Sequence, residues 1–268
     1  MFRSIKYVLN EHIRNVYRIF SIAKYEIVSA NRDTNLGALW NVLNPLIYIA
    51  TYWFVFGIGI RNNKPVDGVP FLPWMLAGLI VWFFMSNCIR KSSNAISSKI
   101  NILEKIKFPI SILPTTIIVS ELFEHIIMFL ITYIFTISQG YGPNIYNIKI
   151  LYYLFCSIMF CISFGLVFSV LSILVKDIKK IIPSVLRLLM YATPILWTME
   201  NLPKSIQVVM KWNPIFYVVE GYRNSIFGNV TSSVDIYSTI VFWIITGVLF
   251  VSGCCLMYKY KHKFVDLG

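Results

Sequence analysis

One uncharged stretch decides the fold class of this chain. It covers residues 150–175 and reads ILYYLFCSIMFCISFGLVFSVLSILV. A helix needs about 20 consecutive apolar residues to cross the roughly 30 Å hydrocarbon layer of a bilayer, and this stretch is longer than that. We therefore expect a transmembrane helix here.

Five other segments resemble this stretch in length or in composition. The six candidate spans are residues 36–60, 71–89, 110–137, 150–175, 181–197 and 236–258. The fifth is short and holds Arg187 near its start. Residues 199–228 are interrupted by Pro203, Pro214 and Gly221, and irregular backbone at membrane depth must be sheltered by protein. We expect them to form a re-entrant or external hairpin of two short helices.

The composition indicates the same class of protein. The chain has 268 residues, of which 57% are hydrophobic and 13% are charged, whereas soluble domains carry roughly 25% charged residues. The net charge of +12 does not indicate nucleic-acid binding, because the basic residues lie in the gaps between apolar segments. We expect an all-helical integral membrane protein without a cleavable signal peptide.

The basic residues also predict an orientation. Alternate gaps contain 18 Lys and Arg residues on one side and six on the other, and the richer side is normally cytoplasmic. Both termini are therefore expected inside, in a multi-pass protein of the plasma membrane. Residues 1–35 alternate apolar and basic positions at helical spacing and predict an amphipathic helix at the membrane interface, followed by one membrane domain over residues 36–268.

Motifs for catalysis are missing from the sequence. The dipeptide Gly-Lys does not occur, so the chain has no P-loop. It has no HExxH or GxSxG motif, and its five cysteines lack metal-binding spacing. We expect no catalytic residue, no metal and no cofactor in this chain; ATP and Mg²⁺ would be bound by a partner subunit.

Three ionisable residues occur within the third candidate span. Glu121, Glu124 and His125 are spaced to share one helical face, and ionisable groups at this depth are costly and usually face protein or water. One interpretation is a proton relay or a polar lining. The other is a cluster of interhelical hydrogen bonds.

Aromatic residues follow one side of the first candidate span. Trp40, Tyr48, Tyr52 and Phe56 lie at multiples of four, with Asn44 at the missing step. Such a stripe suits the apolar faces of sugar rings in a channel, and it equally suits helix packing.

Two gaps on the basic side predict short, charged elements at the membrane face. They are residues 97–114, SSKINILEKIKFPISILP, and residues 175–183, VKDIKKIIP. A motor subunit could push on such elements, and they would equally serve as charged anchors.

Several motifs carry a resemblance to a known family. They are LGALW (36–40) with NPL (44–46), KIKFPISILP (105–114), KD (176–177) where the family commonly has Arg-Asp, TPIL (193–196), and NP (213–214) followed by EGYR (220–223). In this order they resemble the ABC-2 type permeases that export polysaccharides. Residues 52–71 and the tail YKYKHKFVDLG (258–268) are similar to the permeases for wall teichoic acid of Gram-positive bacteria.

The resemblance implies a complex of two permeases and two ABC ATPase subunits. The cargo would be a polymer linked to undecaprenyl pyrophosphate, and Leu36 and Gly37 would lie near the entrance for its head group. The resemblance also implies ATPase-coupling residues, which are Asn101, Glu104, Lys105, Lys107, Lys176, Asp177, Lys179 and Lys180.

Charge alone adds four candidates for that entrance. Arg14, Arg18, Lys24 and Arg32 would attract a polyanionic cargo, or else anionic membrane lipid. The predicted function is teichoic acid export. O-antigen or capsule export is the alternative, and a drug or small-lipid exporter or a polytopic enzyme is a more distant one.

Overall fold

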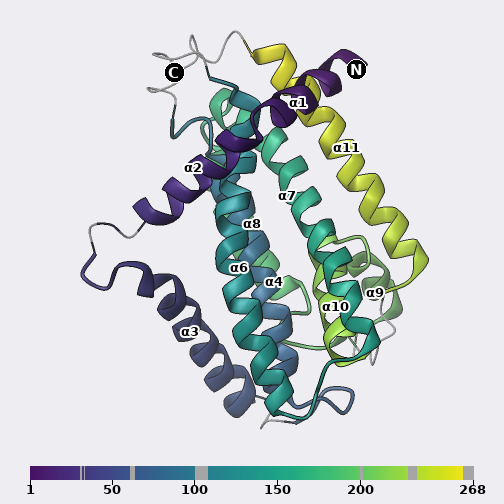
Figure 1. The fold of residues 1–268 in the computed structure, drawn as a ribbon. Helices are drawn as coiled ribbons and strands as arrows, with labels where there is room; N and C mark the ends of the chain where they lie inside the picture. The colour runs from purple at the N-terminus through teal and green to yellow at the C-terminus, as the bar shows by residue number, and fades with distance from the viewer. Residues whose placement is uncertain are drawn as a thin grey trace.

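The computed structural model describes residues 1–30, 32, 34–60, 64–99, 108–199, 202–228 and 234–261. Helices form nearly all of this part of the chain, and its only β structure is an isolated bridge between Val66 and Val69 (Figure 1). The predicted all-helical membrane fold is confirmed.

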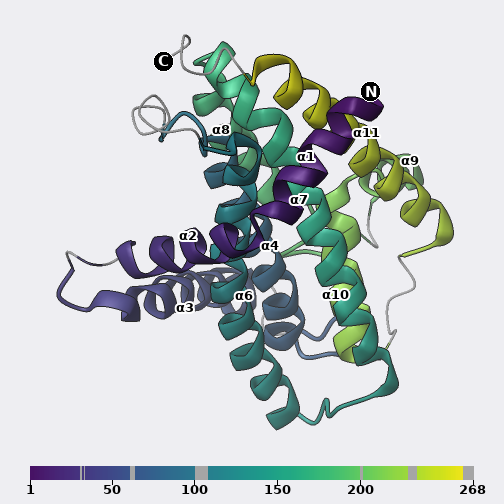
Figure 2. The same ribbon diagram turned by 45° about the horizontal axis from the view of Figure 1, so that its top comes forward.

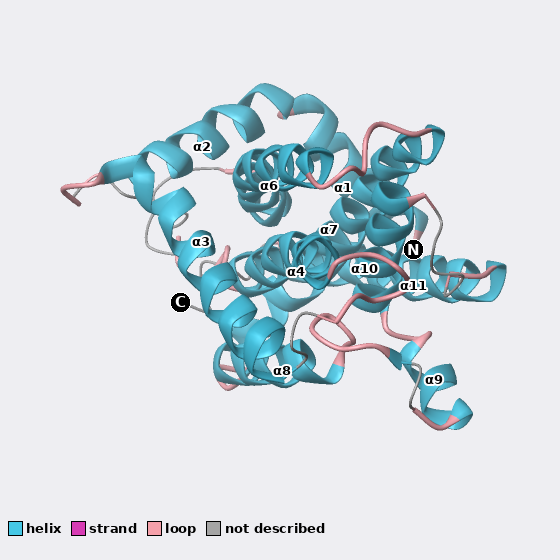
Figure 3. Ribbon diagram, turned by 90° about the horizontal axis from the view of Figure 1, so that it is seen from below, coloured by secondary structure: helices cyan, strands magenta, loops and turns pink. Residues whose placement is uncertain are grey.

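Four helices are long and apolar enough to cross a membrane. They are α4 (Phe71–Ser93), α6 (Leu113–Ser138), α7 (Lys149–Leu174) and α11 (Ile236–Tyr260). Helix α7 packs against α11 on one side and α4 on the other, and α4 packs against α6 (Figures 1 and 3). Helix α4 is the most buried of the four, so it forms the centre of the body.

The first and fifth candidate spans do not form continuous long α-helices, so the count of six spans is not confirmed. The first becomes α3 (Trp40–Tyr52), followed directly by a π-helix (Trp53–Ile60). The fifth becomes α8 (Ile178–Ala192), which ends before the predicted boundary at residue 197. Its end has a local cause, because Thr193 precedes Pro194 and a residue before proline is disfavoured in the α conformation.

The N-terminal segment forms two helices where one was predicted. Helices α1 (Phe2–Arg14) and α2 (Val16–Ser29) meet at Asn15, whose side-chain amide donates to the Glu11 carbonyl over 2.7 Å. Each helix buries only two residues. Helix α1 lies across α11 and α2 lies across α6 (Figure 2), so the two cover one end of the long helices.

The predicted hairpin contains two short helices of different character. Helix α9 (Lys204–Met210) has no buried residue, whereas every residue of α10 (Pro214–Phe227) after Pro214 is buried, mainly between α4 and α7. Fourteen residues make a helix of about 21 Å, which is too short to cross the hydrocarbon layer. The protein thus shelters α10, as a re-entrant element requires.

The two ends of the described chain meet at the same end of the molecule. Helix α1 crosses the last turns of α11 (Figure 1). Tyr7 of α1 lies edge-on to Tyr258 of α11, with ring centroids 5.6 Å apart, and the Lys261 ammonium lies 4.1 Å from the Tyr258 ring centroid. Arg90, Lys91, Lys176 and Lys180 also belong to helix ends or turns at this end. We call it the basic end.

Candidate functional site

Arg223 holds the buried helix α10 in place. Its guanidinium donates to the Pro194 carbonyl over 2.8 Å, to the Ile195 carbonyl over 2.6 Å and to the Trp74 carbonyl over 3.3 Å. It also pairs with Glu220 at 2.7 Å and lies 3.5 Å from the centroid of the Trp74 ring. One side chain therefore joins α10 to the start of α4 and to the turn after α8.

The surrounding chain is built to admit this guanidinium. A Cβ atom on Gly78 of α4 would lie 2.6 Å from an Arg223 nitrogen, so any other residue there would displace the guanidinium. Asn213 caps α10 by accepting from the Ile215 amide over 3.0 Å, and it donates to the Thr193 hydroxyl over 2.8 Å. The separate motifs TPIL, NP and EGYR thus meet in one buried assembly.

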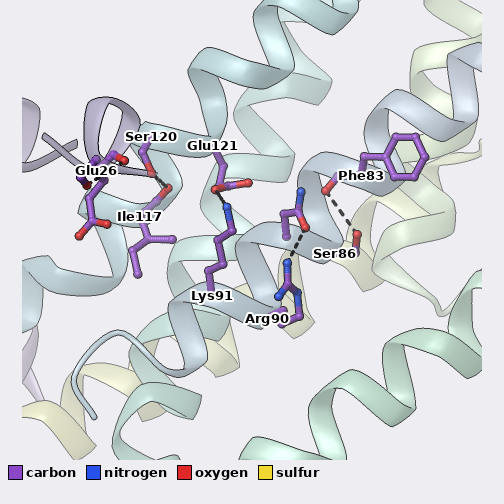
Figure 4. A network of polar contacts seen from close by, with 10 residues as sticks. Glu26, Phe83, Ser86, Arg90, Lys91, Ile117, Ser120 and Glu121 are labelled. Atoms are coloured by element: carbon purple, nitrogen blue, oxygen red, sulfur yellow. Dashed lines mark hydrogen bonds and ion pairs between the residues drawn. The ribbon is translucent and has the colours of Figure 1, made fainter. Parts of the chain in front are cut away.

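A second polar network lies between α2, α4 and α6, near the basic end (Figure 4). Lys91 of α4 pairs with Glu121 of α6, and Lys99 pairs with Glu26 of α2. Three of these side chains border a cavity of 320 Å³ that Glu124 also lines; they are Glu26, Lys91 and Glu121. The Glu121 side chain is 5% exposed, so Lys91 supplies the compensating charge that a buried carboxylate needs.

The ionisable cluster of the third candidate span does not act as one group. His125 is buried, packs against Phe84 with ring centroids 4.6 Å apart, and shares a 3.0 Å hydrogen bond with the Tyr222 hydroxyl of α10. Glu121 instead pairs with Lys91, and Glu124 is half-buried at the cavity. This arrangement agrees with interhelical hydrogen bonding, and it links α6 to both α4 and α10.

The predicted aromatic stripe crosses a change of helix geometry. The chain changes from α to π geometry at Trp53, and the Tyr52 and Phe56 rings stay neighbours there, with centroids 6.5 Å apart. Tyr48 contacts Phe83 of α4 at 6.0 Å between ring centroids, whereas Tyr52 lines a cleft of 240 Å³ between α3, α4 and α8. Trp40 and Phe56 are half-buried and do not line that cleft.

Most residues predicted at the head-group entrance are exposed on the protein surface. Arg14, Arg18, Lys24, Arg32 and Leu36 are exposed, and no described carboxylate pairs with the four cations. Gly37 has φ +51° and begins the 3₁₀ turn Gly37–Leu39 that leads into α3. The glycine is needed there because φ is positive.

Only part of the predicted ATPase-coupling set can be located. Asn101, Glu104, Lys105 and Lys107 lie outside the described residues. Lys176, Asp177, Lys179 and Lys180 are exposed at the turn from α7 into α8, at the basic end. Helix α1 also contacts the chain a few residues after Lys107. The Ser111 hydroxyl donates to the Glu11 carboxylate of α1 over 2.5 Å.

His12 joins α1 to α6. Its Nδ1 lies 2.8 Å from the Val8 carbonyl and its Nε2 lies 2.8 Å from the Thr115 hydroxyl. A carbonyl only accepts, so Nδ1 carries the proton and Nε2 accepts from Thr115. Burial lowers the pKa of His12 below its usual value, which favours this neutral form.

Several residues of these networks were not predicted as site residues. Arg223 and Glu220 entered only through a motif, although an ion pair three residues apart in an apolar segment is itself a signal. Lys91 and Arg90 are neighbours in the sequence, yet Lys91 reaches Glu121 whereas Arg90 bonds to Asn87 on its own helix (Figure 4). No sequence signal distinguishes those two directions.

Three known proteins are similar to this chain in sequence over most of their length. The chain is similar to the O-antigen export system permease protein RfbA of Klebsiella pneumoniae, at 23% identity over 266 residues, which cover 95% of this chain and 99% of that protein. It is similar to RfbA of Myxococcus xanthus at 23% identity over 217 residues, covering 79% and 82%. The polysialic acid transport protein KpsM of Escherichia coli is 22% identical over 214 residues, covering 79% and 82%.

A match to a known family includes the residues of both polar networks and of the buried helix α10. Residues 17–227 match the family described as ABC-2 type transporter. That range runs from the start of α2 to the end of α10 and includes Arg223, Lys91 and the cleft between α3, α4 and α8. Because the match covers well over half of the residues, this chain belongs to the ABC-2 type transporter family.

Proposed function

We propose that this chain is the membrane permease of an ABC exporter that moves a polysaccharide across the plasma membrane. Its relatives are O-antigen export permeases and a polysialic acid transport protein, and their names support an O-antigen or capsular type of cargo. Membership of the ABC-2 family supports the transporter class. The permease itself is not an enzyme in this proposal, and a partner subunit binds ATP and Mg²⁺.

The loose packing of α3 and α8 is the observation that carries the proposal. No described residue of α3 is buried, and α8 buries only Ile182, Leu186 and Met190. The centre of the body between α4 and α7 is instead filled by α10. A polymer path therefore suits the open side, and two copies facing each other there would enclose it, with exposed apolar residues of α3 and α8 covered.

The basic end is the part of the molecule that would bind the ATPase subunit in this proposal. The exposed residues Lys176, Lys179 and Lys180 at the turn between α7 and α8 belong to this end, and the other predicted coupling residues, from Asn101 to Lys107, lie outside the described residues. We place it, with both termini, in the cytoplasm, because basic residues accumulate there.

Teichoic acid export is the second candidate. Residues 52–71 and 258–268 favour it through their similarity to permeases of that type. Its cargo would be a polyol-phosphate polymer on undecaprenyl pyrophosphate, whose negative charge would suit Arg14, Arg18, Lys24 and Arg32.

Reconstitution with a candidate ATPase tests both candidates. The measurement is ATP hydrolysis in liposomes that contain an undecaprenyl-pyrophosphate-linked neutral glycan, a lipid-linked polyol-phosphate polymer, or a small amphiphilic drug. Stimulation by either polymer is expected, and the stronger one identifies the cargo class. Stimulation by the drug alone would refute polysaccharide export.

A further inference from the structure

The cavity between α2, α4 and α6 carries charges of both signs. It has a volume of 320 Å³, and its charged lining consists of Glu26, Arg90, Lys91, Glu121 and Glu124. Neutral polar side chains of the turn after α4 and of α6 complete the lining; they are Asn94, Ser98 and Ser120. Since complementary charges decide which ligand a polar site accepts, the charges that remain unpaired inside this cavity indicate its ligand.

Two ion pairs use most of the charge at the cavity. Lys91 pairs with Glu121, and Lys99 pairs with Glu26. Glu124 is half-buried, and no cation of the described residues lies within 4.0 Å of its carboxylate. A carboxylate that is partly removed from water is costly without a partner, so Glu124 is the anionic group with which a ligand could pair.

Arg90 is the cationic group left at the cavity. No carboxylate of the described residues lies within 4.0 Å of its guanidinium, which donates from Nη2 to the Asn87 side-chain oxygen over 3.1 Å (Figure 4). Asn87 lies about one turn before Lys91 on α4, and Glu124 lies about one turn after Glu121 on α6. Because α4 ends and α6 begins at the basic end, both steps lead deeper into the protein. The Arg90 guanidinium and the Glu124 carboxylate are therefore at a similar depth.

The surface becomes apolar with distance from the basic end. A second hollow, of 30 Å³, shares Glu124 with the first, and Pro45 of α3, Phe83 of α4 and Met128 of α6 belong to its apolar lining. Met128 and Ile131 follow Glu124 by four and seven residues, so they continue its helical face. Ile131 is exposed. Charged groups thus lie near the basic end and an apolar strip lies deeper, in the order of the head group and the acyl chain of a lipid.

We propose that this cavity binds a membrane phospholipid whose head group carries both a phosphate and a primary ammonium, as phosphatidylethanolamine does. The ammonium donates to the Glu124 carboxylate, and the phosphate accepts from the Arg90 guanidinium, whose fork matches phosphate oxygens. One acyl chain lies along Met128 and Ile131. The ligand is a lipid of the leaflet at the basic end and not the cargo, so the proposal is independent of the polymer that the permease exports.

Native mass spectrometry of the full-length permease in detergent tests the proposal. The probes are dioleoyl phosphatidylethanolamine, which has both charged groups, and dioleoyl phosphatidylglycerol, which has the phosphate alone. Glu124→Gln is expected to weaken binding of phosphatidylethanolamine about tenfold, because hydrogen bonds to charged groups are among the strongest, and to leave binding of phosphatidylglycerol no weaker. Arg90→Gln is expected to weaken binding of both lipids, since both present a phosphate.

Asp177→Asn and Arg187→Gln are the matched controls, because they remove the same charges from exposed residues outside the cavity lining. The proposal is overturned if Glu124→Gln binds phosphatidylethanolamine as tightly as Asp177→Asn does. It is also overturned if Glu124→Gln weakens both lipids equally, which is the result that a purely structural role predicts. Displacement of the lipid by an equal concentration of soluble phosphoethanolamine would overturn the role of the acyl chain and hence the assignment to a lipid.

A steric variant keeps the test independent of the folding of the charge variants. Ala30 lines the cavity from the end of α2 and is exposed, so Ala30→Phe reduces the space without changing a charge. It is expected to weaken binding of both lipids, and unchanged binding would overturn the proposal. The melting temperature of every variant, followed by tryptophan fluorescence, identifies those that fold, and Ala30→Phe alone decides the result if Glu124→Gln does not.

Discussion

Replacing Arg223 is expected to cause a large loss of stability. Arg223→Met keeps most of the side-chain volume and removes the ion pair with Glu220, three hydrogen bonds to backbone carbonyls and the contact with the Trp74 ring. The Glu220 side chain is 7% exposed, so its carboxylate would remain buried without the charge of Arg223. Breaking a buried pair in this way costs about 3–5 kcal/mol.

The loss can be measured as a melting temperature. For a chain of this size, 1 kcal/mol corresponds to roughly 2–4 °C, so a decrease of about 6–20 °C is expected. Tryptophan fluorescence of the purified protein in detergent follows the transition. Arg187→Met is the control, because it makes the same substitution at an exposed arginine, and it should change the melting temperature little.

A double variant tests the physical reason. Glu220→Gln combined with Arg223→Met removes both charges, so it should be less destabilised than Arg223→Met alone. If Arg223→Met melts within about 2 °C of the Arg187→Met control, the ion pair does not hold α10 in place. If the double variant is less stable than Arg223→Met, the buried charge of Glu220 is not the cause of the loss.

Three further predictions concern the region near the basic end. Lys91→Met and Glu121→Gln should show a coupling of about 0.5–3 kcal/mol in a double-mutant cycle of melting stability, and additivity would contradict their pairing. Gly37→Ala should cost about 1 kcal/mol, because φ is positive while no atom lies within 4 Å of the added methyl group; Gly37→Asn should lose less, and equal losses would exclude the conformational cause. His12 is neutral in the fold because burial lowers its pKa, so stability should fall as pH decreases below about 6.5; His12→Gln should reduce that dependence in melts across this range, and an unchanged dependence would assign it to another group.

Most elements could be predicted from local patterns. The segments that became α4, α6, α7 and α11 are apolar over the length that a bilayer requires, and this signal depends on neither tertiary contacts nor partners. The hairpin of α9 and α10 was predicted from its prolines and charges. The end of α8 was missed although Pro194 was visible, because hydropathy continues beyond the point where the backbone ceases to be helical.

The candidate site could be predicted less well. Motifs 193–196, 213–214 and 220–223 were recognised, but their convergence on one guanidinium was not. Arg223 bonds to Trp74 across 149 positions of sequence, a distance at which local spacing carries no information. The change from α to π geometry after Tyr52 was not predicted either, since the apolar run that contains it has no local signal for a π turn.

Hydropathy and composition were sufficient for the class of protein, the long helices and the expectation of an ATPase elsewhere, because these depend on the solvent and on local sequence. Tertiary structure decided the environment of each charge. Arg90 and Lys91 are adjacent and both basic, yet Lys91 is neutralised by Glu121 of α6 and Arg90 is left facing a cleft. That difference follows from the packing of α4 between α6 and α8, since a buried carboxylate draws the cation that can reach it and leaves the other to bind elsewhere.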